Sequence, residues 1–309
     1  MVPLVKKLRS LSHFFCLVII AGILPYATIA QVKKEKNNIA LSLFSGYQTD
    51  NLRWSIAGNI QGTTPNILSE LKWKKLQSIV VGGEVKWNIW KGLMIDGYFS
   101  QSYIVAGKVT DTDYGEDNRT APAYYGYFNS NKGGATSVRL MAGYALLLHK
   151  KITVTPWLGY TANSQSLYLL PNDANTPASL KSTYATTWNG AVAGIDLKAH
   201  VANKVFIQPS ILYYQIKYTG KADWNLISIF QHPLSFKDVA NGFSIQPSFK
   251  ISYQFAKQAS VYFTGEYFYW DTGKGTDDLY LSAGPTVPTQ FNEAERNGFV
   301  AAAGISISF

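Results

Sequence analysis

The sequence predicts an all-β fold: a ten-stranded, antiparallel, up-and-down transmembrane β-barrel preceded by a signal peptide. Three observations lead to this prediction. Apolar and polar residues alternate with a period of two from residue 39 onward, and the joints between alternating segments are long and short in turn. After residue 30 no apolar run approaches the roughly 18–20 residues of a membrane-spanning helix. With 14% aromatic and 15% charged residues, the composition also argues against a coiled coil, a helical repeat or a disordered chain.

The N-terminal segment has the layout of a secretory signal peptide. Three basic residues precede an apolar run over residues 14–24, and small residues lead to a predicted cleavage site after Ala30. The predicted organisation is therefore a signal peptide over 1–30 and one barrel over 31–309. The chain has one cysteine, Cys16, inside this signal, so the mature protein cannot use disulfides, cysteine nucleophiles or thiolate metal sites.

The net charge suggests the kind of surface that the protein meets. Without the signal, 25 Lys and Arg stand against 19 Asp and Glu, which gives the mature chain a charge of +6. For an exported protein this charge favours anionic lipid headgroups or polysaccharide, and we expect no nucleic-acid partner.

The alternation defines the strands. Over residues 243–255 every odd position is apolar and every even position is polar, and residues 299–309 repeat the pattern with one apolar face. The pattern predicts ten strands, at 39–49, 70–88, 92–106, 137–148, 152–170, 184–199, 204–220, 243–256, 259–271 and 298–309.

The joints predict the orientation. Five are long, 50–69, 107–136, 171–183, 221–242 and 272–297, and four are tight, 89–91, 149–151, 200–203 and 257–258. Because alternate joints of an up-and-down sheet lie on opposite rims, all long loops share one rim and both termini lie near the other. This asymmetry and the even strand count are typical of bacterial outer-membrane barrels, with loops extracellular and termini periplasmic.

A soluble barrel or sandwich is the alternative, since its core also needs alternation. Tryptophans near strand ends favour the membrane barrel, because an aromatic girdle contacts the headgroups. The residues expected in this girdle are Trp73, Trp87, Trp90, Trp157, Trp188 and Trp270. The terminal residue Phe309, which closes an alternating strand, favours the same interpretation.

The second long loop contains the densest group of acids, around Asp111 and Asp113. Residues two apart in an extended chain point the same way, so these carboxylates can form a pair in which like charge raises one pKa and allows water activation. A calcium site and a solvated acidic loop are the alternatives, although the spacing does not complete a calcium-loop pattern.

The fourth long loop carries Asp223 and His232. The other mature histidines, His149 and His200, fall in or beside tight turns on the opposite rim, so histidine chemistry at the loop rim must use His232. The second and fourth loops are roughly opposite each other in a ten-strand barrel. An acid pair would therefore face an Asp and a His across the mouth.

Several stretches resemble the omptins, outer-membrane endopeptidases built on ten-stranded barrels. They are Ser69-Glu70-Leu71-Lys72-Trp73-Lys74, Gly83-Glu84-Val85-Lys86-Trp87, Asp96-Gly97, Asp111-Thr112-Asp113-Tyr114, Ala259-Ser260-Val261-Tyr262, Gly265-Glu266, Lys274-Gly275 and the closing strand 298–309. The resemblance covers nearly the whole mature chain, with low identity outside these islands.

The resemblance implies a set of site residues. Asp111 and Asp113 would be the family's acid pair and Asp223 its third catalytic acid. The family's histidine lies two residues after that third acid, where this chain has Asn225, so His232 would have to replace it. For substrate binding, Asp50 matches one acid of the pocket that selects basic residues, whereas Lys221 stands at the position of the other.

The sequence thus predicts an omptin-like barrel that is either a surface endopeptidase of altered site or a member that has lost catalysis. The alternative is a non-enzymatic barrel, either a narrow pore or a surface interaction protein. We expect no cofactor and no metal. Expected partners are outer-membrane lipid, lipopolysaccharide by resemblance, the barrel assembly machinery, and a peptide or protein substrate if the site is active.

Overall fold

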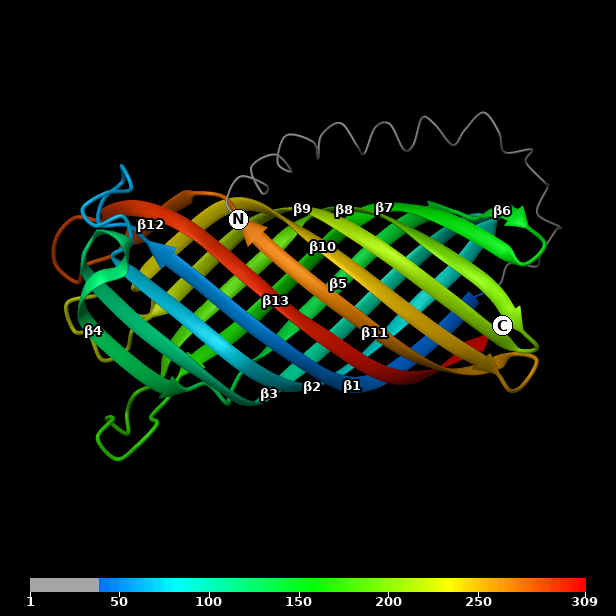
Figure 1. Cartoon of the computed structure of the whole chain (residues 1–309), viewed down its shortest axis with the longest axis horizontal. Coiled ribbons are helices and arrows are strands. Elements are labelled where there is room, and N and C mark those ends of the chain that lie inside the picture. The colour runs from blue at the N-terminus through cyan, green and yellow to red at the C-terminus, as the bar shows by residue number, and fades with distance from the viewer. Residues whose placement is uncertain (1–38) are drawn as a thin grey trace.

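The computed structural model describes residues 39–309, which form a closed β-barrel of tilted strands with the larger loops at one end (Figure 1). The expected signal peptide lies outside the described residues. Within 39–309, no helical segment has the length and apolar character needed to cross a membrane.

The ring consists of ten antiparallel strand positions, as predicted. Its order is β1-β2-β3-β5-β7-β8-β9-β10-β11-β13, with β6 continuing the β5 position, and pairing of β13 with β1 closes it from Ala40↔Ser308 to Ile56↔Phe291. The elements are β1 Ile39–Ile56, β2 Ser69–Trp90, β3 Leu93–Glu116, the 3-10 turn η1 Asp117–Arg119, β4 Thr120–Asn129, β5 Gly134–Tyr144, β6 Leu146–His149, β7 Ile152–Leu169, β8 Ser182–Ala202, β9 Val205–Asp223, β10 Phe236–Gln254, β11 Ala259–Thr272, β12 Gly275–Leu279 and β13 Val287–Ser308.

The strands extend further toward the loop rim than the sequence predicted. β1 continues to Ile56, β3 to Glu116, and β10 and β13 begin at Phe236 and Val287. Two segments predicted as loop are also strands: β4 pairs with β3, and β12 pairs with β10 and β13. The prediction failed here because these extensions carry polar residues on the outward face, which removes the apolar alternation on which the prediction depended.

An apolar band surrounds the part of the barrel nearer the tight turns, as a bilayer-facing surface requires. This part is called the lower barrel, and the part nearer the long loops the upper barrel. Outward side chains such as Leu140 and Leu158 are 60% and 66% exposed. The inward face of the same region is charged: Lys86 lies 3.4 Å from Asp196 and 3.5 Å from Asp96. This inside-out pattern belongs to a membrane barrel and excludes the soluble alternative.

The band ends well below the loop rim. On β1 the outward residue Tyr47 pairs with Ile79, and further up the outward face becomes charged. There Arg53 forms ion pairs with Glu293 at 2.7 Å and Glu295 at 2.8 Å. The upper barrel therefore stands in water.

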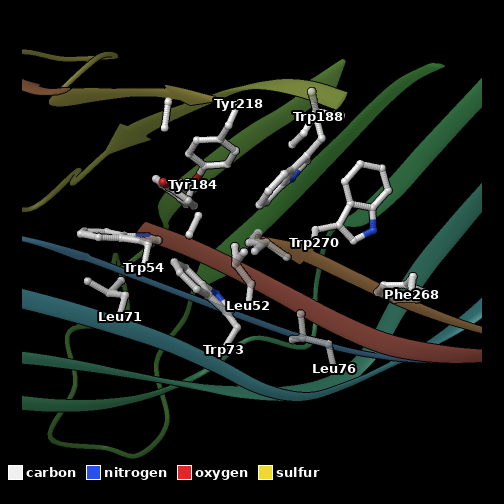
Figure 2. Packing of buried hydrophobic residues seen from close by; sticks show 14 of the residues in the cluster. Leu52, Trp54, Leu71, Trp73, Leu76, Tyr184, Trp188, Tyr218, Phe268 and Trp270 are labelled. Carbon is white, nitrogen blue, oxygen red and sulfur yellow. Dashed lines mark hydrogen bonds between the residues drawn. The ribbon is translucent and has the colours of Figure 1, made fainter. Parts of the chain in front are cut away.

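Aromatic side chains fill the lumen of this upper region (Figure 2). Trp73 of β2 stacks on Tyr184 of β8 with ring centroids 5.4 Å apart, although these strands lie on nearly opposite walls. Trp54 and Phe236 meet across the same space at 5.6 Å. The barrel is thus packed across its width at this level.

This cluster corrects the predicted aromatic girdle. Of the six tryptophans assigned to it, only Trp87 and Trp90 are exposed. The other four are buried side chains of the core cluster, at most 4% exposed: Trp73, Trp157, Trp188 and Trp270. Position near a strand end did not reveal which face of the strand a residue occupies, and these four side chains point into the barrel.

Candidate functional site

The acid pair lies on the inner face of the upper part of β3. Asp111 pairs in register with Leu71 of β2, eight residues beyond Ile79 at the edge of the apolar band. At ~3.3 Å per residue and a tilt of about 45°, this places it roughly 15–20 Å above the band. Asp111 is 7% exposed, and Asp113 is half-buried and accepts a hydrogen bond from Ser69. Both side chains thus lie on the inner face of β3, and the charge of Asp113 acts on Asp111.

Burial and like charge perturb the acidity of this pair. Burial first, and then the neighbouring Asp113 charge, raise the pKa of Asp111 to about 7. Burial also raises the pKa of Asp113. The Oδ1 atom of Asp111 is buried without a hydrogen-bond partner among residues 39–309. Asp111 can therefore hold or release a proton near neutral pH.

The second half of the site is at the end of β9. His232 Nδ1 lies 2.6 Å from Asp223 Oδ1, although nine residues separate them in sequence. Its Nε2 contacts the Ile227 carbonyl at 3.3 Å. Both side chains are partly exposed, 37% for His232 and 26% for Asp223.

The 224–235 loop makes this contact possible by folding back on itself. Ser235 Oγ accepts a hydrogen bond from the Trp224 backbone N–H at 2.9 Å and donates one to the Gln231 carbonyl at 3.1 Å. Phe230 forms a β-bridge with Leu281 of the neighbouring loop. These contacts return the chain to its starting point and place His232 beside Asp223.

Trp224 connects the two halves. Its side chain donates a hydrogen bond to Asp111, which lowers the pKa of that carboxyl against the larger effects that raise it. The indole is 8% exposed and packs edge-on against Phe236 with centroids 4.8 Å apart. Sequence reasoning did not assign this residue a role; its position directly after a candidate acid was the only signal.

Asn225, at the position of the omptin histidine, has a different task. Its Oδ1 accepts hydrogen bonds from Lys181 N at 3.0 Å and Ser182 Oγ at 3.2 Å, and its Nδ2 donates to the Ser179 carbonyl at 2.9 Å. The side chain therefore joins the 224–235 loop to the segment before β8.

Asp50 lies away from these four residues. It is 3% exposed and pairs with Arg296, whose Nη2 is 2.7 Å from Asp50 Oδ2, while Gln165 donates to the same oxygen at 2.9 Å. Its register partner on β2 is Leu76, five residues below the partner of Asp111. Lys221 is exposed on the outer side of β9. The structure thus places Asp111 beside Asp113 and His232 beside Asp223, with Trp224, the neighbour of Asp223, acting on Asp111. Asp50 is held by Arg296 instead.

No group of three or more His, Cys, Asp or Glu side chains in the described part of the chain could hold a metal ion. The arrangement can instead perform acid–base chemistry, with an Asp-oriented histidine on one side and a carboxyl that titrates near neutrality on the other.

Comparison with known proteins identifies the family. A model of the Protochlamydia outer membrane protein family matches residues 42–309. The chain belongs to this family. It is an outer-membrane β-barrel protein, and its environment is therefore lipid.

The barrel is also similar to solved structures of outer-membrane proteins. The outer membrane protease OmpT from Escherichia coli aligns with a TM-score of 0.70 and 12% identity over 90% of this chain and 99% of that one. The translocator domain of the autotransporter NalP from Neisseria meningitidis aligns at 0.40 and 9% over 98% and 97%, and the toluene transporter TbuX from Ralstonia pickettii at 0.39 and 8% over 89% and 90%. No curated protein matches. The likeness to OmpT shows that the two chains share a fold.

Proposed function

We propose that this protein is an omptin-like surface endopeptidase with an altered active site. The observation that carries the proposal is the 2.6 Å contact between His232 and Asp223. It supplies a histidine oriented by a carboxylate, although Asn225 occupies the position of the omptin histidine. The fold shared with a protein named as a protease is the second support.

In the proposed reaction a water molecule replaces the Ile227 carbonyl at His232 Nε2, since that contact of 3.3 Å is long. His232 takes a proton from this water as its oxygen attacks the carbonyl carbon of the peptide. Asp223 stabilises the imidazolium that forms. His232 then returns the proton to the leaving amine as the C–N bond breaks.

The acid pair acts on the carbonyl oxygen. Protonated Asp111 donates a hydrogen bond to the developing oxyanion, a role that suits a buried carboxyl whose pKa is about 7. Asp113 keeps that proton in place through its own charge, and the Trp224 side chain links Asp111 to the end of β9.

The packed lumen argues against the pore alternative. Aromatic rings from β1, β2, β8 and β10 meet in the middle of the barrel above the apolar band. Solutes cannot pass such a cluster without its rearrangement, whereas a close-packed lumen beside the acid pair suits a catalytic site.

For orientation we propose that the loop rim is extracellular and the termini are periplasmic. A substrate peptide then reaches the site from outside the cell. Lipopolysaccharide and the barrel assembly machinery are the further partners that we propose. The first follows from the resemblance to the omptins, and the second from the need to insert a closed barrel into the outer membrane.

The decisive experiment is a cleavage assay. The purified barrel is incubated with a quenched-fluorescent library of random peptides, and His232→Ala is compared with His200→Ala, a matched control near the opposite rim. We expect cleavage that His232→Ala reduces at least ~10²-fold, the scale of losing a general base, and that His200→Ala leaves unchanged. If the intact protein cleaves nothing, the member has lost catalysis and the proposal fails.

A further inference from the structure

β4 has one edge that no other strand of the described chain covers. It pairs with β3 on one side and lies outside the path of the ring. On its other side, one isolated bridge, Asn129↔Leu170, is its only strand pairing within residues 39–309. Residues 120–125 are exposed.

The bridge shows which backbone groups face this edge. Asn129 N–H donates to the Leu170 carbonyl at 3.0 Å, and Leu170 N–H donates back at 2.9 Å. Because the direction of backbone groups alternates along a strand, Tyr127 and Tyr125 present their N–H and C=O groups to the same edge. The backbone N–H and C=O groups of Gly126 and Tyr124 point toward β3 instead, where these residues pair with Asp111 and Asp113.

The segment that pairs with this edge ends at Leu170, next to the unpaired backbone groups of Tyr127 and Tyr125. After Leu170 the chain turns away at Pro171, whose carbonyl accepts a hydrogen bond from Asn129 Nδ2 at 2.7 Å. Tyr127 and Tyr125 therefore lie where the next residues of an antiparallel partner would pair, and that partner is missing among the described residues.

The edge is also close to the candidate site. Adjacent strands lie ~4.8 Å apart, so a strand added to β4 would run about 10 Å from the backbone of β3. The charges of Asp111 and Asp113, after the larger effect of burial, raise the pKa of Tyr124, which shows that its hydroxyl lies within their field. Side chains of an added strand that face inward, as Tyr124 does, would face the acid pair.

We propose that an extended segment of a polypeptide substrate adds to β4 as an antiparallel strand, hydrogen-bonded to Tyr125 and Tyr127, and so leads its scissile bond toward the acid pair. The inference rests on the proposed function and names its substrate class: unfolded chain with free backbone groups on both sides of the cleavage point. Two outward residues suit a short peptide better than a second copy of the barrel, because stable subunit interfaces bury more than about 1,000 Å².

The test uses a matched pair of variants at one position. Tyr125→Pro removes the outward N–H but leaves the bonds between β3 and β4, whereas Tyr125→Ala removes the side chain and keeps the N–H. The probe is a fluorescein-labelled ten-residue peptide, selected from a random library by binding to the intact barrel in detergent micelles. We expect Tyr125→Pro to raise its Kd at least ~tenfold and Tyr125→Ala to change it less than ~twofold; equal effects of the two variants, or none, would overturn the inference.

Two further measurements keep the result unambiguous. N-methylation of the peptide, one residue at a time, should weaken binding to the unaltered barrel only at alternate positions. Because this test does not use the variant, it remains valid even if Tyr125→Pro misfolds. If no library peptide binds, or if the edge instead forms a barrel dimer that Tyr125→Pro dissociates, the inference is wrong. Cleavage that is insensitive to Tyr125→Pro would overturn the inference alone, whereas the expected binding without any cleavage would overturn the proposed function alone.

Discussion

The two halves of the candidate site are built in opposite ways. Asp111 and Asp113 lie within a long strand, held by pairing with β2 and β4 on either side, and Asp111 is buried. Asp223 is the last residue of β9 and His232 belongs to a loop, and both side chains are partly exposed. The first half is fixed by the sheet, whereas the second depends on how one loop folds.

The two halves therefore contribute different properties: the buried half a carboxyl of shifted pKa, and the exposed half a histidine of defined orientation. The buried half has a pKa moved to about 7 by its surroundings, so it can serve as a proton reservoir. The exposed half gains its geometry from a hydrogen bond and from the ties made by Ser235. A site divided in this way predicts that changes to the two halves have different signatures.

The largest effect should come from testing whether the halves act as one unit. We expect Asp111→Asn and His232→Ala each to lower the rate of peptide hydrolysis by ~10²–10⁴-fold, because each removes a group that moves or holds a proton. The double variant should be little slower than either single variant, since cooperating catalytic groups are not additive. Losses that multiply in steady-state kinetics would instead mean that the halves work independently.

Asp50, the acid that the sequence assigned to substrate binding, can be compared with the acids of the candidate site. Asp50→Asn leaves the guanidinium of Arg296, which is 6% exposed, without its buried counter-charge. We expect the free energy of unfolding to fall by about 3–5 kcal/mol, measured by urea titration in detergent micelles. The double change Asp50→Asn with Arg296→Met should recover part of this loss. A selective loss of cleavage at basic residues with unchanged stability would show that Asp50 binds substrate after all.

Asn225 tests the loop-borne half. Asn225→Ala removes three hydrogen bonds to Ser179, Lys181 and Ser182, and we expect a local loss of about 1–3 kcal/mol. Limited proteolysis should then cut the segment 170–181 faster, with unchanged heat-modifiability of the barrel in gels. Asn225→His should cause the same loosening and no gain of activity. A gain would show that the loop can rebuild the omptin arrangement and that His232 is dispensable.

The sequence predicted the membrane barrel and the shared face of Asp111 and Asp113 because both depend on local patterns. Alternation reports which face of a strand meets lipid, and a spacing of two places Asp111 and Asp113 on one side. The contact of His232 with Asp223 was only a conjecture from the resemblance, since a loop's path depends on ties such as Ser235 that have no sequence pattern. The buried positions of Trp73 and Trp188 were missed for a related reason: outside the lipid band, polarity no longer distinguishes the faces of a strand.

The smallest expected effects concern the pH dependence of the cleavage rate, which reports on the protonation of Asp111 in the buried half. If protonated Asp111 is the reactive form, cleavage falls as pH rises through about 7, where this carboxyl ionises. The same raised pKa means that the folded state binds this proton more tightly than the unfolded chain, whose carboxyl has the ordinary value of 3.8. The contribution of Asp111 to stability is therefore lost between pH 4 and about 7 as pH rises.

Two variants should move this descending limb of the pH–rate profile in opposite directions. Asp113→Asn removes the like charge, so the pKa of Asp111 falls and the limb moves to lower pH by about one unit. Trp224→Phe removes the hydrogen bond that favours the carboxylate, so the pKa rises and the limb moves to higher pH by less than one unit. Profiles of kcat/KM from pH 5 to about 9 measure both shifts in the free enzyme. A limb that stays in place in both variants would assign it to a group other than Asp111, and it would leave the buried half a structural support for the histidine opposite.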